Sequence, residues 1–159
     1  VRSSAASDVY KRQAVGLWLS YVVLSFILVG NVMFTMHGMM YIANSFIFSI
    51  CALTIAFLIG NLITNKNAIN GIINVVALGS SFLCGAFVPM EWLPDSVLKI
   101  AHILPSYYYI STNEMLKQLE VFNLDTMKPI IINMGAIVIF TAGFIIITNI
   151  ISRKKRKIG

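Results

Sequence analysis

The sequence predicts an all-α, polytopic membrane protein with four transmembrane helices. Four stretches contain no Asp, Glu, Lys or Arg, namely 14–35, 41–63, 69–90 and 129–152. A hydrocarbon core about 30 Å thick needs about 20 apolar residues of helix, and each stretch meets this length. The composition agrees, because 58% of the 159 residues are hydrophobic and only 11% are charged, whereas a soluble domain is about 25% charged.

The first residues, 1–13, differ from the rest of the chain. They read VRSSAASDVYKRQ, are polar, and end abruptly at the first span. They lack the apolar core and the small-residue cleavage site of a signal peptide, and they are similar to translated sequencing-adapter text. We expect a non-native or disordered leader, with a short cytoplasmic tail as the alternative. Residues 14–159 are then the C-terminal portion of a longer protein.

The positive charge of the chain is concentrated after the last span. The formal net charge is +6, and five of the twelve basic residues form the run 153–157. Basic segments beside a span stay in the cytoplasm, next to anionic lipid. We therefore expect a multi-pass protein of the cytoplasmic membrane, with the tail 153–159 and the loop 64–68 inside and the segment 91–128 outside. No aromatic or glycine-rich RNA-binding pattern accompanies the charge, so no nucleic-acid partner is expected.

The segment 91–128 predicts two short helices between the third and fourth spans. Pro94 and Pro105 bracket a short apolar run, and a second helix is expected from Pro105 to about Glu120, because proline suits the start of a helix and is poor inside one. The first run is too short to span a membrane and too apolar for water, which favours a re-entrant or interfacial position. The tyrosines 107–109 fit either the membrane boundary or a contact with a substrate.

The spans contain neutral polar residues and no ionisable acid or base, unlike most ion-coupled transporters. In the third span, Asn70, Asn74 and Ser81 share one helix face with small residues, close to Phe82 and Phe87. An asparagine in hydrocarbon needs a polar partner, so this face is expected to point into protein or a wet cavity. Two interpretations stay open: helix packing, and the lining of a substrate path or its gate.

Catalytic and metal-binding patterns are missing from the sequence. The chain has no HExxH, GxSxG or GxxxxGK[ST] motif, which would hold zinc, a nucleophilic serine or nucleotide phosphates. Cys51 and Cys84 both lie inside expected spans, where they suit apolar packing. We expect no catalytic residue, no metal site and no directly bound cofactor, so that any energy for transport comes from a partner.

The end of the third span reads GAFVPMEWLPDSVLKIAHILPSYYYI. The pattern consists of six residues: Gly85, Phe87, Pro89, Leu93, Pro94 and Pro105. It resembles the signature of the type 2 ATP-binding-cassette (ABC) transporter permeases, the membrane subunits of many bacterial exporters. Its placement also fits, because it follows the penultimate span and precedes a last span and a basic tail. The resemblance covers residues 14–159.

The resemblance implies six spans per subunit, of which the four here would be the last four. It also implies a second permease subunit, as a homodimer or heterodimer, and ABC ATPase subunits that supply the energy. The segment 91–120 would match a pair of external re-entrant helices. The main docking surface for the ATPase would lie upstream of residue 14, and the inner loop Thr64, Asn65, Lys66 and Asn67 is either a secondary contact or merely a polar turn.

The function expected from this resemblance is export across the cytoplasmic membrane. The cargo class favoured by the neutral, apolar spans is a drug, a peptide antibiotic or a lipid-like molecule. One alternative is a membrane protein of the phage-receptor or secretion-accessory kind that shares this half of the chain. Another is a membrane scaffold without a transport role, which predicts that the polar face of the third span is packed and dry.

Overall fold

The computed structural model describes residues 2–158, with side chains for residues 8–65 and 67–154. Every element in this part of the chain is a helix, so the expected all-α class is confirmed. In order, these are α1 (Arg2–Val29), the 3-10 helix η1 (Gly30–Phe34), α2 (Met36–Leu62), α3 (Lys66–Leu83), the 3-10 helix η2 (Met90–Trp92), α4 (Asp95–Ala101), α5 (Pro105–Gln118) and α6 (Leu124–Ile158).

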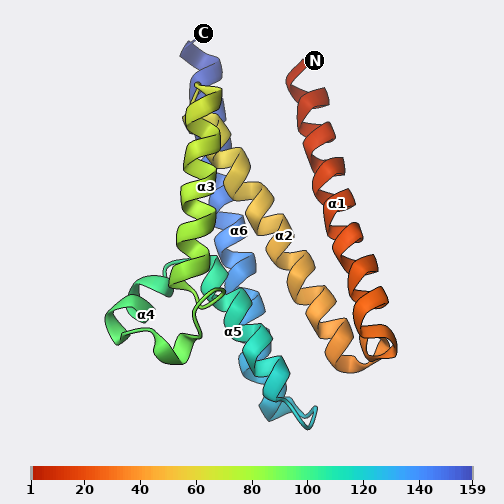
Figure 1. Ribbon diagram of the computed structural model, residues 1–159. Coiled ribbons are helices and arrows are strands. Elements are labelled where there is room, and N and C mark those ends of the chain that lie inside the picture. Colours follow the sequence, from red (N-terminus) through yellow and green to blue (C-terminus); the bar gives the residue numbers. More distant parts are fainter. Residues whose placement is uncertain (1, 159) are drawn as a thin grey trace.

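Helices α2, α5 and α6 form the packed centre of the structure. α2 and α6 lie side by side, and α5 packs against both of them near one end (Figure 1). Most of the largest fully buried side chains come from these three helices: Asn44, Cys51, Thr112, Leu116, Ile130 and Ile137. α1 makes fewer contacts and diverges from α2 along its length (Figure 1).

The two chain ends lie at the same end of the bundle, together with the connection between α2 and α3 (Figure 1). η1, α4 and the connection between α5 and α6 lie at the opposite end (Figure 1). The long helices therefore run antiparallel to their neighbours in the chain, as the short connections predict. Everything between the third and fourth long helices is gathered at the end away from the termini.

Three described helical segments are long and apolar enough to cross a membrane: Asp8–Phe34, Met36–Leu62 and Leu124–Lys154. They correspond to the expected first, second and fourth spans. The apolar segment Asn67–Leu83 is shorter; α3 has 18 residues, about 27 Å of helix. The described chain is thus a multi-pass, all-helical membrane structure.

The boundaries expected for the third span, 69–90, are wrong, because α3 runs from Lys66 to Leu83. Gly85 adopts a left-handed φ of +93°, and the N–H of Ala86 donates to the carbonyl oxygen of Ser81 at 3.0 Å. This is the Schellman arrangement, in which a glycine just past the last turn ends the helix. The chain after Leu83 therefore turns away from the helix axis.

The fourth long helix begins at Leu124, five residues before the expected start of its span. Asn123 and Thr126 exchange two hydrogen bonds: the N–H of Thr126 donates to Asn123 Oδ1 at 2.8 Å, and the N–H of Asn123 donates to Thr126 Oγ1 at 3.1 Å. This reciprocal cap satisfies N–H groups that a helix start leaves without partners. Pro129 lies inside the helix.

The two short helices expected between the third and fourth spans are present. α4 follows Pro94, and α5 has Pro105 at its first position and ends at Gln118, two residues before the expected end. Residues 2–13, expected to be a leader, are the first turns of α1, and side chains 8–13 are exposed. Their helical backbone does not bear on their origin, and the leader stays a prediction.

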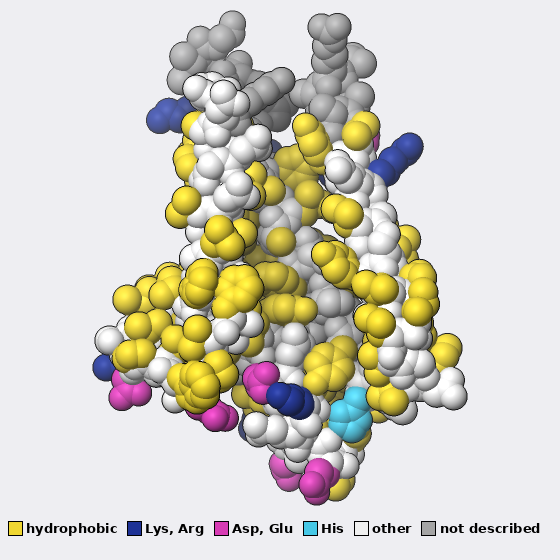
Figure 2. All heavy atoms as spheres, in the orientation of Figure 1, with side chains coloured by type: hydrophobic (Ala, Val, Ile, Leu, Met, Phe, Trp, Pro, Cys, Tyr) yellow, Lys and Arg dark blue, Asp and Glu magenta, His cyan; other side chains and the backbone are white. Residues whose placement is uncertain are grey.

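Large apolar side chains cover much of the outer surface. Examples are Ile27 on α1 and Ile139 on α6, which are 73% and 74% exposed, and apolar atoms appear along the faces of the long helices in Figure 2. In water this surface would be costly to expose, but facing lipid it is the ordinary condition of a transmembrane helix.

Candidate functional site

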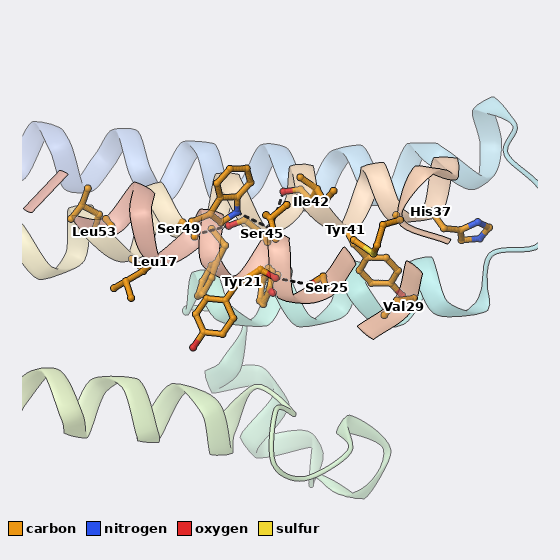
Figure 3. A pocket seen from close by; sticks show the side chains of 18 of the residues that line it. Leu17, Tyr21, Ser25, Val29, His37, Tyr41, Ile42, Ser45, Ser49 and Leu53 are labelled. Carbon is orange, nitrogen blue, oxygen red and sulfur yellow. Dashed lines mark hydrogen bonds between the residues drawn. The ribbon is translucent and has the colours of Figure 1, made fainter. Parts of the chain in front are cut away.

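Two cavities lie on either side of α2. The first has a volume of about 820 Å³ and lies mainly between α1 and α2; Figure 3 shows its lining, and the hollow between α1 and α3 in Figure 2 opens on this region. The second has a volume of about 330 Å³ and lies between α2, α3 and α5. Four residues line both cavities: Phe48, Ala52, Ala56 and Tyr109.

The small residues of α2 leave the space of the first cavity. Ser45, Ser49, Ala52 and Ala56 recur along one face of α2 and all line this cavity. Ser45 and Ser49 donate their hydroxyl hydrogens to carbonyl oxygens of their own helix, at 2.8 Å each. Because these hydroxyl groups have partners within their own helix, the two serines can line a mostly apolar cavity. This face of small residues therefore borders a cavity and does not pack closely against a neighbouring helix.

Trp18 joins α1 to α2 at the edge of the first cavity. Its indole N–H donates to Ser45 Oγ at 3.0 Å, and its ring meets Phe46 edge-on at a centroid distance of 4.9 Å. A tryptophan inside a membrane protein needs a partner for its single N–H. This hydrogen bond therefore fixes where α1, otherwise loosely attached, lies against α2.

A buried polar junction attaches α5 to α2. Asn44 of α2 is fully buried. Its side-chain amide nitrogen donates to Tyr109 O at 3.0 Å and to Asn113 Oδ1 at 2.9 Å. The hydroxyl of Tyr41 donates to Asn113 O at 3.1 Å. Asn133 of α6 adds a contact to the other side of α5 by donating to Ser111 Oγ at 3.2 Å. α5 is thus held by hydrogen bonds from both long helices.

The three consecutive tyrosines of α5 have different surroundings. The ring of Tyr109 stacks on Phe48 of α2, at 4.4 Å between centroids and 12° between planes. Tyr108 meets Phe140 of α6 at 5.8 Å, and its hydroxyl donates to His102 O at 3.1 Å. Tyr107 lies 4.0 Å from the His102 ring. Of the three, only Tyr109 lines the two cavities, so a substrate contact applies to it alone, and a boundary role suits the other two.

The residues expected to form a path or gate are only partly brought together. Ser81 lines the second cavity. Asn70 and Asn74 are exposed and line neither cavity. Phe82 and Phe87 contact each other at 4.9 Å across the end of α3, and both rings are more than half exposed. The path and gate roles of all five residues stay predictions, and the geometry links Ser81 alone to a cavity.

The signature residues lie in the turns between α3 and α5. A Cβ on Gly85 would lie 2.6 Å from Met90 Cγ, so the turn needs both its φ and its missing side chain. Pro89 precedes η2, and Pro94 precedes α4. The remaining members are Leu93, which is half-buried; Phe87, which is exposed; and Pro105, which is buried at the start of α5.

The loop between α2 and α3 contains the possible ATPase contact. Asn65 Oδ1 accepts hydrogen bonds from the N–H groups of Asn67 and Ala68, at 3.0 and 3.4 Å. Asn65 is therefore the N-cap of α3, which explains this residue without a partner protein. Thr64, Asn65 and Asn67 are exposed, while the side chain of Lys66 lies outside the described residues. The contact with an ATPase stays a prediction.

Sequence reasoning missed the residues that shape the cavities. Phe48 does not stand out in the sequence, because it is one apolar residue among many in its span. Its stacking partner Tyr109 is 61 positions away in the chain, so no local pattern links the two residues. Asn44 did carry a signal: it is an asparagine inside a charge-free span, and such a side chain needs a polar partner. That argument was applied to Asn70 and Asn74, whereas the buried asparagine is Asn44.

Comparison with known proteins assigns the chain to a family. Residues 14–113, from the first long helix into α5, match the ABC-2 type transporter family. The chain belongs to this family. No curated protein and no solved structure matches the chain. The matched range contains all the described lining residues of the two cavities and all six signature positions.

Membership makes this chain a permease portion, the membrane-spanning part of an ABC transporter. The family domain is not itself catalytic, and such permeases generally work with an ATPase subunit. Among the described residues, no three His, Cys, Asp or Glu side chains lie together in a way that could hold a metal ion. The candidate site of this ABC-2 permease is therefore the pair of cavities around α2.

Proposed function

We propose that this ABC-2 permease is the C-terminal part of a six-span exporter subunit, with α1, α2, α3 and α6 as its last four spans. α3 is the shortest of them, and about 27 Å of helix nearly equals the hydrocarbon thickness. The turn at Gly85 then lies at the membrane boundary, and α4 and α5 form the re-entrant or interfacial pair. Two such subunits, identical or different, complete the transporter.

The observation that carries the proposal is the pair of cavities with a common wall. Among the residues that the structure describes, neither lining contains an Asp, Glu, Lys or Arg side chain, and burying a charged cargo against such walls would be costly. The favoured cargo is thus a neutral or amphipathic molecule: a drug, a peptide antibiotic or a lipid-like molecule. Cavities of this size are within the range that holds such ligands.

The basic tail supports a cytoplasmic C-terminus. Arg153 and Lys154, the described start of the run, are exposed at the end of α6, and anionic lipid and the positive-inside rule favour the cytoplasm for them. The loop 64–67 lies at the same end of the bundle (Figure 1), which supports a contact with a cytoplasmic ATPase. ATP stays on that partner, and the permease binds none itself.

Transport by the full-length permease together with its ATPase tests this function. The complex is reconstituted in liposomes, and ATP-dependent movement is measured for one probe of each cargo class: azidopine, the neutral depsipeptide antibiotic valinomycin and a fluorescent phospholipid analogue. We expect movement of at least one probe that is lost when the ATPase carries a substitution in its phosphate-binding lysine. If ATP causes no movement of any of the three probes, the result would contradict the proposal and favour a scaffold or a secretion-accessory protein.

A further inference from the structure

The two cavities meet at a single aromatic pair. Phe48 projects from α2 and Tyr109 from α5, and the two rings stack nearly parallel at 4.4 Å and 12°. Both residues line the larger cavity toward α1 and the smaller one toward α3. Ala52 and Ala56, which continue the common wall along α2, are too small to close the space. The ring pair is therefore the bulkiest part of the partition.

Resting on the proposed function, we propose that the cavities are consecutive compartments of one substrate path and that the Phe48–Tyr109 pair is the gate between them. The pair opens when a flat, ring-bearing, neutral amphipath replaces one ring as the stacking partner of the other. Offset stacking between aromatic faces is favourable by itself, so the exchange of one partner for another costs little.

The two halves of the pair are attached differently, and this difference makes a gate possible. Tyr109 is held in place through its backbone, because Asn44 donates to its carbonyl oxygen at 3.0 Å. The next turn of α5 is held through Asn113, which bonds with Asn44 and Tyr41. Phe48 belongs to a long helix that is only half-buried at this ring. Rotation of the half-buried Phe48 side chain thus separates the rings while the hydrogen bonds between α2 and α5 stay intact.

The chemistry of the walls selects the cargo. The two linings contain the serines at 25, 45, 49, 80, 81 and 106. Those at 25, 45, 49 and 81 already donate their hydrogen to a carbonyl oxygen of the same helix, which leaves their oxygen atoms as acceptors. They offer hydrogen bonds to a neutral molecule, and no described lining residue offers an opposite charge to an ion. At the end near η1, His37 of the larger cavity already contacts the carbonyl oxygen of Leu119 at 2.6 Å. A neutral ring with a few hydrogen-bond donors matches these surroundings better than a charged peptide.

Photolabelling of the full-length permease in complex with its ATPase tests the gate. The probe is azidopine, a neutral photoreactive dihydropyridine, and labelled positions are mapped by mass spectrometry without nucleotide. In the wild type we expect adducts mainly in one of the two cavities. In Phe48→Ala and in Tyr109→Ala, the other cavity should gain about fivefold more adducts, the change in population that loss of one aromatic pair produces.

Matched variants separate the gate from general damage. Phe46→Ala removes an aromatic residue two positions away on α2, one that pairs with Trp18 and lines neither cavity, and it should keep the wild-type pattern. Tyr109→Phe keeps the ring and should do the same. If Phe48→Ala does not fold, Phe48→Leu and Tyr109→Leu replace the flat rings with branched chains of smaller volume and should also open the partition.

The outcomes distinguish this inference from the proposed function. Three results would overturn the gate. The wild type could show equal labelling of both cavities or labelling of neither, or Phe46→Ala could show the same redistribution as the gate variants. A wild-type complex that shows the expected adducts but moves no probe with ATP would overturn the exporter function while the partition stands. ATP-driven movement unaffected by either alanine variant, with unchanged adducts, would overturn the gate alone.

Discussion

Asn44 of α2 and Asn113 of α5 are joined by a hydrogen bond of 2.9 Å inside the packed centre of the protein. The same Asn44 amide also donates to Tyr109 O. Asn44 is fully buried, so water or lipid headgroups cannot replace these partners. This residue therefore combines two tasks: it attaches the short helix α5 to a long helix, and it keeps Tyr109 beside Phe48.

Replacing Asn44 by alanine is expected to destabilise the full-length protein by about 1 kcal/mol, since hydrogen bonds between membrane helices are worth about that much and Tyr109 O and Asn113 Oδ1 lose their donor. Thermal unfolding in nanodiscs measures the change. Ser20→Ala is the matched control, because its hydroxyl is exposed and bonds only within α1, to Gly16 O. Equal stability of Asn44→Ala and the control would contradict the role of Asn44.

Gly38→Ala is expected to destabilise the connection between η1 and α2. A Cβ at this position would lie 2.4 Å from Met33 Cα and 2.5 Å from Met33 O, and backbone atoms cannot move aside cheaply. Overpacking of this kind costs about 1–3 kcal/mol. Gly60→Ala, on the same helix with no atom within 4 Å, should be neutral or stabilising. Chemical denaturation of both variants makes the comparison, and a Gly38→Ala protein as stable as Gly60→Ala would refute it.

The long helices could be predicted from sequence because lipid imposes one simple requirement. A charge-free stretch of sufficient length must satisfy its backbone groups internally, and a helix does so. Short capping motifs set the true boundaries: Thr35 and Asn123 start α2 and α6 before the expected spans, and Gly85 ends α3 early. A hydropathy pattern averages over many residues and does not register a single cap.

The candidate site was harder to predict because it depends on contacts between distant segments. The face with Ser81 was expected to point into protein or a wet cavity, and Ser81 lines the smaller cavity, while its role in a path stays a prediction. Asn70 and Asn74 share its helix face by spacing, but both are exposed, whereas Ile73, next to Asn74, lines the cavity. A helical repeat specifies which residues share a face and not which side of the helix a neighbour will cover. The stack of Tyr109 on Phe48 depends on where α5 docks, which no local pattern indicates.

Gly85→Ala is expected to weaken the turn that ends α3. The position combines a φ of +93° with Met90 Cγ at 2.6 Å from the added Cβ, so the variant incurs both a backbone and a contact penalty, together about 2 kcal/mol. Gly30→Ala provides the comparison, because Gly30 has a φ of +63° but no atom within 4 Å and incurs the backbone penalty alone. Differential scanning fluorimetry should rank Gly85→Ala below Gly30→Ala; the reverse order would contradict this account of the signature glycine.

The position of α3 across the membrane leads to the last prediction. Thr64 precedes α3 and Asp125 follows α4 and α5, and both side chains are exposed. If α3 crosses the bilayer, these two positions lie on opposite sides, since α4 and α5 return to the side they left.

The full-length protein, with Cys51 and Cys84 replaced by alanine, receives one new cysteine at a time: Thr64→Cys, Asp125→Cys or Lys154→Cys. A membrane-impermeant maleimide should label Asp125→Cys in intact cells, but label Thr64→Cys and Lys154→Cys only after permeabilisation. Labelling of Thr64→Cys and Asp125→Cys from the same side would show that α3 does not cross, and the chain would then have three spans rather than four.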